Sequence, residues 1–181
     1  LAAFNNDNVY LEKVVLTPKH VEVQVIADTF GNIVHLGTRD CSIQRRNQKL
    51  VEIAPSMIQD QALLDSICET AVKAAKASNY TNAGTVEFLM DKDGKFYFIE
   101  VNPRIQVEHT VTELVTMRNL VQAQIRIAEG YQLADPEIGI KSQKDIELRG
   151  YAIQSRITTE DPQNNFIPDY GRITAFREAT G

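Results

Sequence analysis

The chain has 181 residues, of which 43% are hydrophobic and 24% are charged, and its formal net charge is −5 at pH 7. That length allows one domain with a sizeable core, or one domain and part of another. No stretch approaches the roughly 18 consecutive apolar residues of a membrane span, and a net negative charge provides no general attraction to nucleic acid. A soluble protein that binds neither membranes nor nucleic acid is therefore expected. Cys41 and Cys68 lack metal-like spacing, which favours a reducing compartment, and we expect the cytoplasm.

The first third of the chain predicts strands. Val9–Val15 alternates well enough for one strand. Val21–Val25 and Ile33–Leu36 predict a hairpin around the loop 28–32, with Gly31 as its turn residue. The segment Thr38–Lys49 is rich in arginine and has almost no apolar content, so we expect it at the surface. It is either a solvated charge run or the wall of a cleft in which Gln44 and Lys49 reach phosphate or bicarbonate.

Helices are predicted in the middle of the chain. Ser56-x-x-Gln59 resembles a capping box, and apolar residues recur at helical spacing over Asp60–Ala77. A short helical turn is expected over Thr112–Thr116, and a further helix from an Asn119 cap to Glu129, before Gly130. Residues 134–144 read as a connector, 149–158 as a strand, 160–171 as a loop and 172–177 as a further strand. Together these elements predict an α+β fold with a mainly antiparallel sheet and helices packed on one face.

The most informative stretch is a hairpin around Asp93-Gly94, a dipeptide that favours a two-residue turn. That register pairs Lys92 with Lys95 and Glu87 with Glu100. One face of the hairpin is apolar and is expected to pack on the core, namely Val86, Phe88, Met90, Tyr97, Ile99 and Val101. The other face carries both glutamates and Asn102, with Leu89 opposite Phe98.

Two carboxylates directly opposite each other repel, so either both point into water or a cation lies between them. Oxygen ligands on one rigid face suit Mg²⁺ or Mn²⁺. The run Asn102–His109 then adds Arg104, Gln106 and Glu108 close to these candidate ligands. That density of functional groups favours a binding site over a solvated sheet face.

Several short motifs stand in the order and spacing of the biotin carboxylase family, which has an ATP-grasp fold. They are Glu12-Lys13, His20-Val21-Glu22, Arg39-Asp40-Cys41-Ser42-x-Gln44-Arg45-Arg46, Gly84-Thr85-x-Glu87-Phe88, Glu100-x-Asn102-x-Arg104-x-Gln106-Val107-Glu108-His109, and Arg156. The resemblance covers nearly the whole chain. The runs Asn102–His109 and Thr158–Pro162 look most like the members that use pyruvate as the carboxyl acceptor.

The resemblance implies a role for each matching position. Nucleotide contacts are implied for Glu12, Lys13, the backbone near Val15, His20, Gln44, Asn47 and Leu89. Metal ligation is implied for Glu87, Glu100 and Asn102, and bicarbonate binding for Lys49, Arg104, Gln106 and the amide of Val107. The implied catalytic set is Glu108, Arg104, Arg156 and Lys49. In it Glu108 is the general base for bicarbonate, and Arg156 stabilises the enolate of biotin's ureido group.

The implied cofactors are ATP, Mg²⁺ or Mn²⁺, and biotin carried on another domain. The implied partners are bicarbonate, the biotinylated carrier domain and further copies of the full-length chain in a homo-oligomer. Residues 1–148 would be an ATP-grasp part without the upstream glycine-rich lid and N-terminal domain, and residues 149–181 the beginning of the biotin carboxylase C-terminal domain. The chain is thus expected to be part of a longer protein and to be inactive in isolation.

Two positions depart from the family pattern. Asn47 stands where the family has histidine, and Met117-Arg118-Asn119 replaces Gly-Val-Asp. His109 is expected to support Glu108, and Cys41 to be a packed thiol. Two alternatives stay open: the biotin carboxylase of an acyl-CoA or urea carboxylase, and a non-catalytic fragment that packs or dimerises.

Overall fold

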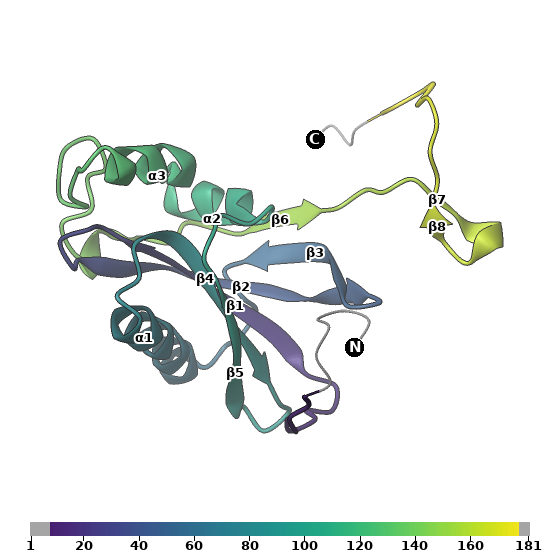
Figure 1. The fold of residues 1–181 in the computed structure, drawn as a ribbon, viewed down its shortest axis with the longest axis horizontal. Helices are drawn as coiled ribbons and strands as arrows, with labels where there is room; N and C mark the ends of the chain where they lie inside the picture. Colours follow the sequence, from purple (N-terminus) through teal and green to yellow (C-terminus); the bar gives the residue numbers. More distant parts are fainter. Residues whose placement is uncertain (1–7, 178–181) are drawn as a thin grey trace.

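The computed structural model describes residues 8–177, and within them the fold is built on one antiparallel sheet of six strands (Figure 1). The strand order is β5-β4-β1-β2-β3-β6, and every neighbouring pair is antiparallel. The strands are β1 (Lys19–Ala27), β2 (Ile33–Arg45), β3 (Gln48–Ala54), β4 (Asn82–Met90), β5 (Phe96–Asn102) and β6 (Ala152–Ser155). The predicted α+β fold with a mainly antiparallel sheet is confirmed.

Helices cover both faces of this sheet, whereas helices on one face were predicted (Figure 1). α1 (Gln61–Ala77) packs on the face formed by Val21, Val23 and Val25. α3 (Leu120–Ala128) packs on the opposite face, where Ile26 lies. The prediction was wrong because the polar residues that alternate with these valines suggested a solvated face, but β1 is buried on both faces. That second face holds the candidate site.

The helix boundaries follow local capping. α1 begins after Asp60, whose carboxylate accepts a hydrogen bond from the Leu63 amide at 3.1 Å. The capping box predicted at Ser56 does not form. Ser56 is buried instead, and its hydroxyl pairs with that of Thr38. Asn119 caps α3 as expected, through the amide of Gln122.

The remaining elements are short. α2 (His109–Thr116) starts three residues before the predicted turn and ends at Met117, whose left-handed φ of 54° is one that glycine adopts more readily. Short 3₁₀ turns occur at η1 (Gln143–Asp145) and η2 (Pro162–Asn164), and β7 (Glu160–Asp161) pairs with β8 (Ile167–Pro168). Within residues 8–177, no helix is long and apolar enough to span a membrane.

Three strand predictions were wrong or too long. Residues 9–15 are irregular, as are residues 172–177, and both segments are largely exposed. The strand expected over 149–158 is limited to β6. Alternation of apolar and polar residues is not sufficient for a strand, because a strand also needs a neighbour that accepts its backbone hydrogen bonds.

The segment Thr38–Lys49 was predicted at the surface but forms most of β2 and the start of β3. Arg39 and Cys41 are fully buried. The two strands are joined by a tight turn at Arg46 and Asn47, which have φ values of 52° and 61°. Asparagine tolerates this left-handed conformation better than most residues, so Asn47 suits the turn in which it lies.

The β4–β5 hairpin forms as expected, but its loop has three residues because the Asp91 amide bonds to the Lys95 carbonyl at 2.9 Å. The predicted pairs Lys92–Lys95 and Leu89–Phe98 are therefore wrong; Leu89 lies opposite Tyr97. A bulge between Glu87 and Phe88 restores the register, so that Glu87 does lie opposite Glu100. Between the loop and the bulge, the residues of β5 therefore point to the face opposite to the one predicted for them. Phe96 packs on the core against Phe88, and Ile99 lines the cleft described below.

Candidate functional site

A cleft of about 780 Å³ opens at the end of the sheet, between β1, β3, β4 and β5 and the loop before α2. It brings together most of the predicted site residues, namely His20, Gln44, Asn47, Lys49, Glu87, Leu89, Glu100, Asn102, Arg104, Gln106, Val107, Glu108 and Arg156. Gln48, Leu50, Ile99 and Thr158 complete its lining. Glu12, Lys13 and Val15 do not line it. Lys13 instead bonds to the Tyr97 hydroxyl at 2.7 Å.

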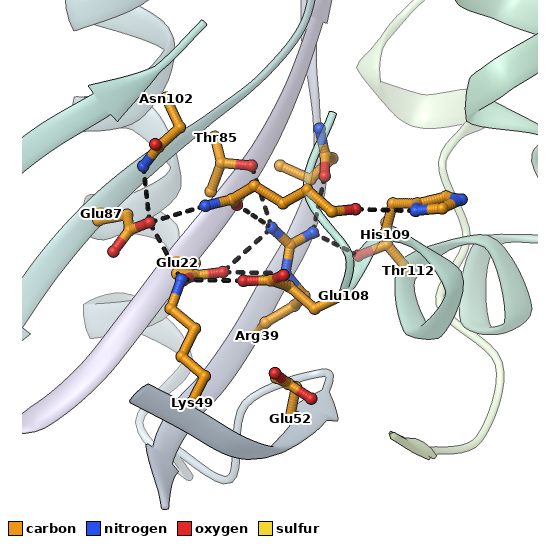
Figure 2. A network of polar contacts seen from close by, with 12 residues as sticks. Glu22, Arg39, Lys49, Glu52, Thr85, Glu87, Asn102, Glu108, His109 and Thr112 are labelled. Atoms are coloured by element: carbon orange, nitrogen blue, oxygen red, sulfur yellow. Dashed lines mark hydrogen bonds and ion pairs between the residues drawn. The ribbon is translucent and has the colours of Figure 1, made fainter. Parts of the chain in front are cut away.

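Glu87 lies at the centre of the cleft and is 4% exposed. Its Oε1 accepts hydrogen bonds from Asn102 at 2.7 Å, from Gln106 at 2.8 Å and from Lys49 at 3.1 Å (Figure 2). Its Oε2 lies 2.5 Å from Nε2 of His20. Burial by itself raises the pKa of Glu87, but the His20 hydrogen bond and the charge of Lys49 outweigh it and lower that pKa to about 2.

This shift predicts an acid-dependent loss of stability. Because the pKa of Glu87 falls from 4.5 to about 2 on folding, its ionised form stabilises the fold fully above pH 4.5 and loses this effect as pH falls toward 2. The contribution at neutral pH is about 3 kcal/mol. We expect the difference in unfolding free energy between wild type and Glu87→Gln to shrink over that range. Glu147→Gln is the control, because it removes a carboxylate that is largely exposed. A constant difference for Glu87→Gln would contradict the prediction.

Lys49 is the cation shared by three carboxylates. Its Nζ lies 2.9 Å from Glu108 and 3.1 Å from Glu87, and it also bonds to Glu22 (Figure 2). Burial lowers the pKa of Lys49, but these carboxylates raise it well above its ordinary value, so the ammonium stays charged. The side chain of Lys49 is 13% exposed, so this positive charge faces the cleft with little screening by water.

Glu108 lies between two cations. One carboxylate oxygen accepts from Lys49 at 2.9 Å and the other from Arg156 at 2.8 Å. Burial raises the pKa of Glu108, but the hydrogen bond and charge of Lys49 bring it below its usual range, so Glu108 is ionised at neutral pH. Arg156 also donates to Glu52 at 2.6 Å. His109 contacts the Gln106 carbonyl at 2.8 Å, and so supports the loop that carries Glu108 rather than Glu108 itself.

The candidate metal ligands lie on β4 and β5. Asn102 Nδ2 lies 2.7 Å from Glu87 and 3.2 Å from Glu100, which is exposed. The repulsion expected between the two glutamates is thus relieved by an amide bridge and by Lys49. Two carboxylates and an amide on adjacent strands are hard oxygen donors that fit Mg²⁺ or Mn²⁺, provided the Asn102 amide turns its oxygen inward.

The remaining predicted residues lie around the rim. His20 Nδ1 pairs with Gln44 Nε2 at 2.7 Å, beside Leu89 and Ile99. Arg104 and Val107 are exposed at the cleft mouth. Cys41 is fully buried, and burial raises the pKa of its thiol, which is typical of a packed cysteine and not of a nucleophile.

Sequence reasoning missed the buried layer beneath the cleft. Glu22, Arg39 and Glu52 are each fully buried on the sheet face that supports the site. The available signal was the alternation His20-Val21-Glu22-Val23-Gln24, which places the polar residues on the same face of β1 as Glu87 on β4.

Comparison with known proteins defines the class. The family model described as carbamoyl-phosphate synthase L chain, ATP binding domain, matches residues 1–136. The chain belongs to this family of ATP-binding domains.

Within that class the similarity is to carboxylases. Pyruvate carboxylase of Bacillus subtilis is 59% identical over 180 residues, which are 99% of this chain and 16% of that protein. Biotin carboxylase of a Nostoc species is 53% identical over 175 residues, which are 97% of this chain and 38% of that protein. The chain thus spans about a sixth of the pyruvate carboxylases that it matches.

Solved structures give the same result. A complete multifunctional pyruvate carboxylase from Rhizobium etli superposes with a TM-score of 0.90 at 57% identity, over 100% of this chain and 18% of that chain. A biotin carboxylase-β-γ-ATP complex from Campylobacter jejuni gives a TM-score of 0.89 at 47% identity, over 99% of this chain and 39% of that chain. The resemblance to the biotin carboxylase region of pyruvate carboxylase and its ATP-grasp fold is confirmed.

Proposed function

We propose that this chain is part of the biotin carboxylase component of a pyruvate carboxylase. That component uses ATP and bicarbonate to carboxylate biotin, and the carboxyl group then passes to pyruvate to give oxaloacetate. The observation that carries the proposal is the meeting, in one cleft, of a carboxylate face, a shared lysine and an ionised glutamate held between two cations.

Bicarbonate is assigned to the cationic side of the cleft. Lys49, Arg104, Gln106 and the amide of Val107 would hold it beside Glu108. Bicarbonate is a poor nucleophile until cations position it and a base removes its proton. Glu108 takes that proton, and a bicarbonate oxygen attacks the γ-phosphorus of ATP as ADP leaves. The product, carboxyphosphate, breaks down to CO₂ and phosphate.

ATP is assigned to the opposite side. His20, Gln44, Asn47 and Leu89 line that part of the cleft, and the resemblance adds Glu12, Lys13 and Val15, which lie outside it here. Glu87, Glu100 and Asn102 would hold Mg²⁺ or Mn²⁺. A divalent ion bound there would neutralise the transferring phosphoryl group.

The biotin of a carrier domain is the proposed acceptor of CO₂. Arg156 is the cation available to its ureido oxygen, where negative charge develops as a proton leaves the ring nitrogen. The proposal also includes a domain boundary between residues 148 and 149. It further includes a homo-oligomeric full-length protein and a cytoplasmic location. β6 lies beyond that boundary and still pairs with β3, so the boundary would cross one sheet.

The metal assignment predicts the effect of Glu100→Lys. A lysine there puts a cation where the metal would lie, so we expect Mg²⁺-dependent binding of a non-hydrolysable ATP analogue to be abolished. Folding should persist because Glu100 is exposed and the change removes a repulsive pair. Calorimetry on the full-length protein measures the affinity, with Glu69→Lys on the exposed face of α1 as the charge-matched control. Normal binding by Glu100→Lys would mean that the glutamate pair is only a solvated face.

The function itself is tested on the full-length protein. Purified protein is incubated with ATP, Mg²⁺ and bicarbonate, and phosphate release is measured with pyruvate, an acyl-CoA or urea as acceptor. Bicarbonate-dependent cleavage with carboxylation of pyruvate alone is expected. Carboxylation of an acyl-CoA or of urea would show that this compound, and not pyruvate, is the carboxyl acceptor. The absence of bicarbonate-dependent cleavage would favour a packing or dimerisation fragment.

A further inference from the structure

Arg39 has no part in the function proposed above, yet it lies at the centre of the network beneath the cleft (Figure 2). It stands on β2 and is fully buried. Desolvating a guanidinium costs several kcal/mol, and apolar residues of similar volume often stabilise a core equally well. The presence of this charge therefore needs a reason other than packing.

Every donor of Arg39 is used. Nε donates to Glu22 at 3.1 Å. Nη1 donates to Gln24 at 2.7 Å and to Thr112 at 3.0 Å, and Nη2 donates to Thr85 at 3.0 Å and to Gln106 at 3.1 Å. One planar group thus joins β1, β4, the loop before α2, and α2 itself. A side chain with fewer or more flexible donors does not reproduce this fork.

The geometry at Gln106 follows from the chemistry of Arg39. A guanidinium has five N–H donors and no acceptor, so the Gln106 atom that faces it must be the amide oxygen. The amide nitrogen must then face the other way, and it donates to Glu87 at 2.8 Å. That nitrogen has a second N–H, and Gln106 lines the cleft.

We infer that Arg39 is a positioning residue that fixes the orientation of the Gln106 amide and the start of α2, and thereby prepares the bicarbonate subsite. The inference rests on the proposed function, because it takes the anion beside Gln106 and Glu108 to be bicarbonate. Without Arg39, the Gln106 amide can rotate and present its oxygen to the anion, which repels it.

The test uses Arg39→Lys in the full-length protein. Lysine keeps the charge beside Glu22 but lacks the planar fork, so it cannot hold Gln106 and Thr85 together. We expect the KM for bicarbonate to rise about tenfold or more, the loss associated with one hydrogen bond to a charged ligand. The KM for ATP should change by less than about twofold, and kcat at saturating bicarbonate should be largely retained.

Two further variants separate positioning from stability. Thr85→Val removes one acceptor of Arg39 while leaving Gln106 intact, and we expect a smaller rise in the KM for bicarbonate. Thr38→Val is the matched control, because Thr38 is a buried threonine beside Arg39 in sequence whose hydroxyl pairs with Ser56 and not with Arg39. It should lower the melting temperature without changing the KM for bicarbonate.

The outcomes are distinguishable. Wild-type protein without bicarbonate-dependent ATP cleavage would overturn the proposed function before any variant is compared. An active wild type together with an Arg39→Lys variant of unchanged bicarbonate KM would overturn the positioning role alone, as would an equal rise in Thr38→Val. If Arg39→Lys does not fold, the same comparison is made between Thr85→Val and Thr38→Val.

Discussion

Glu108→Gln in the full-length protein is expected to lower bicarbonate-dependent ATP cleavage by about 10²- to 10⁴-fold, the usual contribution of a general base. Glu108 is 2% exposed and its oxygens are 2.9 Å from Lys49 and 2.8 Å from Arg156. Glutamine has nearly the same size, but its amide nitrogen must face either Lys49 or Arg156, and neither cation can accept a hydrogen bond. Glutamine cannot accept the bicarbonate proton, and its neutral amide leaves the two cations without their shared counter-charge.

The rate is measured as phosphate release with and without bicarbonate. Glu147→Gln is the control, because it also removes a carboxylate that accepts from an arginine, but 69% of its side chain is exposed. Nucleotide affinity should be nearly unchanged in Glu108→Gln, since the nucleotide is assigned to the opposite side of the cleft. Unchanged bicarbonate-dependent turnover would contradict the catalytic assignment of Glu108.

Lys49→Met is expected to lower the free energy of unfolding by about 3–5 kcal/mol, because it removes one partner from a buried ion-pair network. Glu22, Glu87 and Glu108 would lose the cation that they share and would repel each other. Methionine has a similar length, so the effect would come from charge more than from volume. Bicarbonate-dependent cleavage should be lost as well.

Thermal unfolding of the full-length protein measures this effect. Lys73→Met is the control, because Lys73 forms an exposed pair on α1 whose loss should cost less than about 0.5 kcal/mol. Added Mg²⁺ should recover part of the stability of Lys49→Met, since three carboxylates without a lysine are oxygen ligands for a divalent ion. A loss no larger than that of Lys73→Met, with no response to Mg²⁺, would show that Lys49 does not hold the cluster together.

Much of the fold could be predicted because its signals are local. The Asn119 cap, the helical spacing over α1 and the turn at Gly31 depend on neighbours within a few residues. The exposed strand over Val9–Val15 was predicted in error, because alternation says nothing about whether a partner strand is present. The second layer of helices was missed for a related reason. A polar residue such as Gln24 looks solvated in the sequence, but here it is buried with partners from other elements.

The residues that line the cleft could be predicted more completely than those that support it. Glu108 follows from the run that leaves β5. Glu87 does lie opposite Glu100 as predicted, but only because the bulge cancels the extra residue of the loop. Arg39 lies in a segment whose composition favours solvent. Its five acceptors come from β1, β4, the loop before α2 and α2 itself, and these contacts span up to 73 residues in sequence.

The bulge in β5 also has a consequence for base selectivity. Because it turns Phe96 to the core and Ile99 to the cleft, the apolar residues that line the cleft are all aliphatic, namely Leu50, Leu89, Ile99 and Val107. Aliphatic side chains contact the flat face of any purine or pyrimidine by dispersion and lack the quadrupole that makes aromatic stacking geometrically specific. In the proposed nucleotide site, we therefore expect discrimination between ATP and GTP to come from hydrogen bonds at the edge of the base and not from these aliphatic side chains.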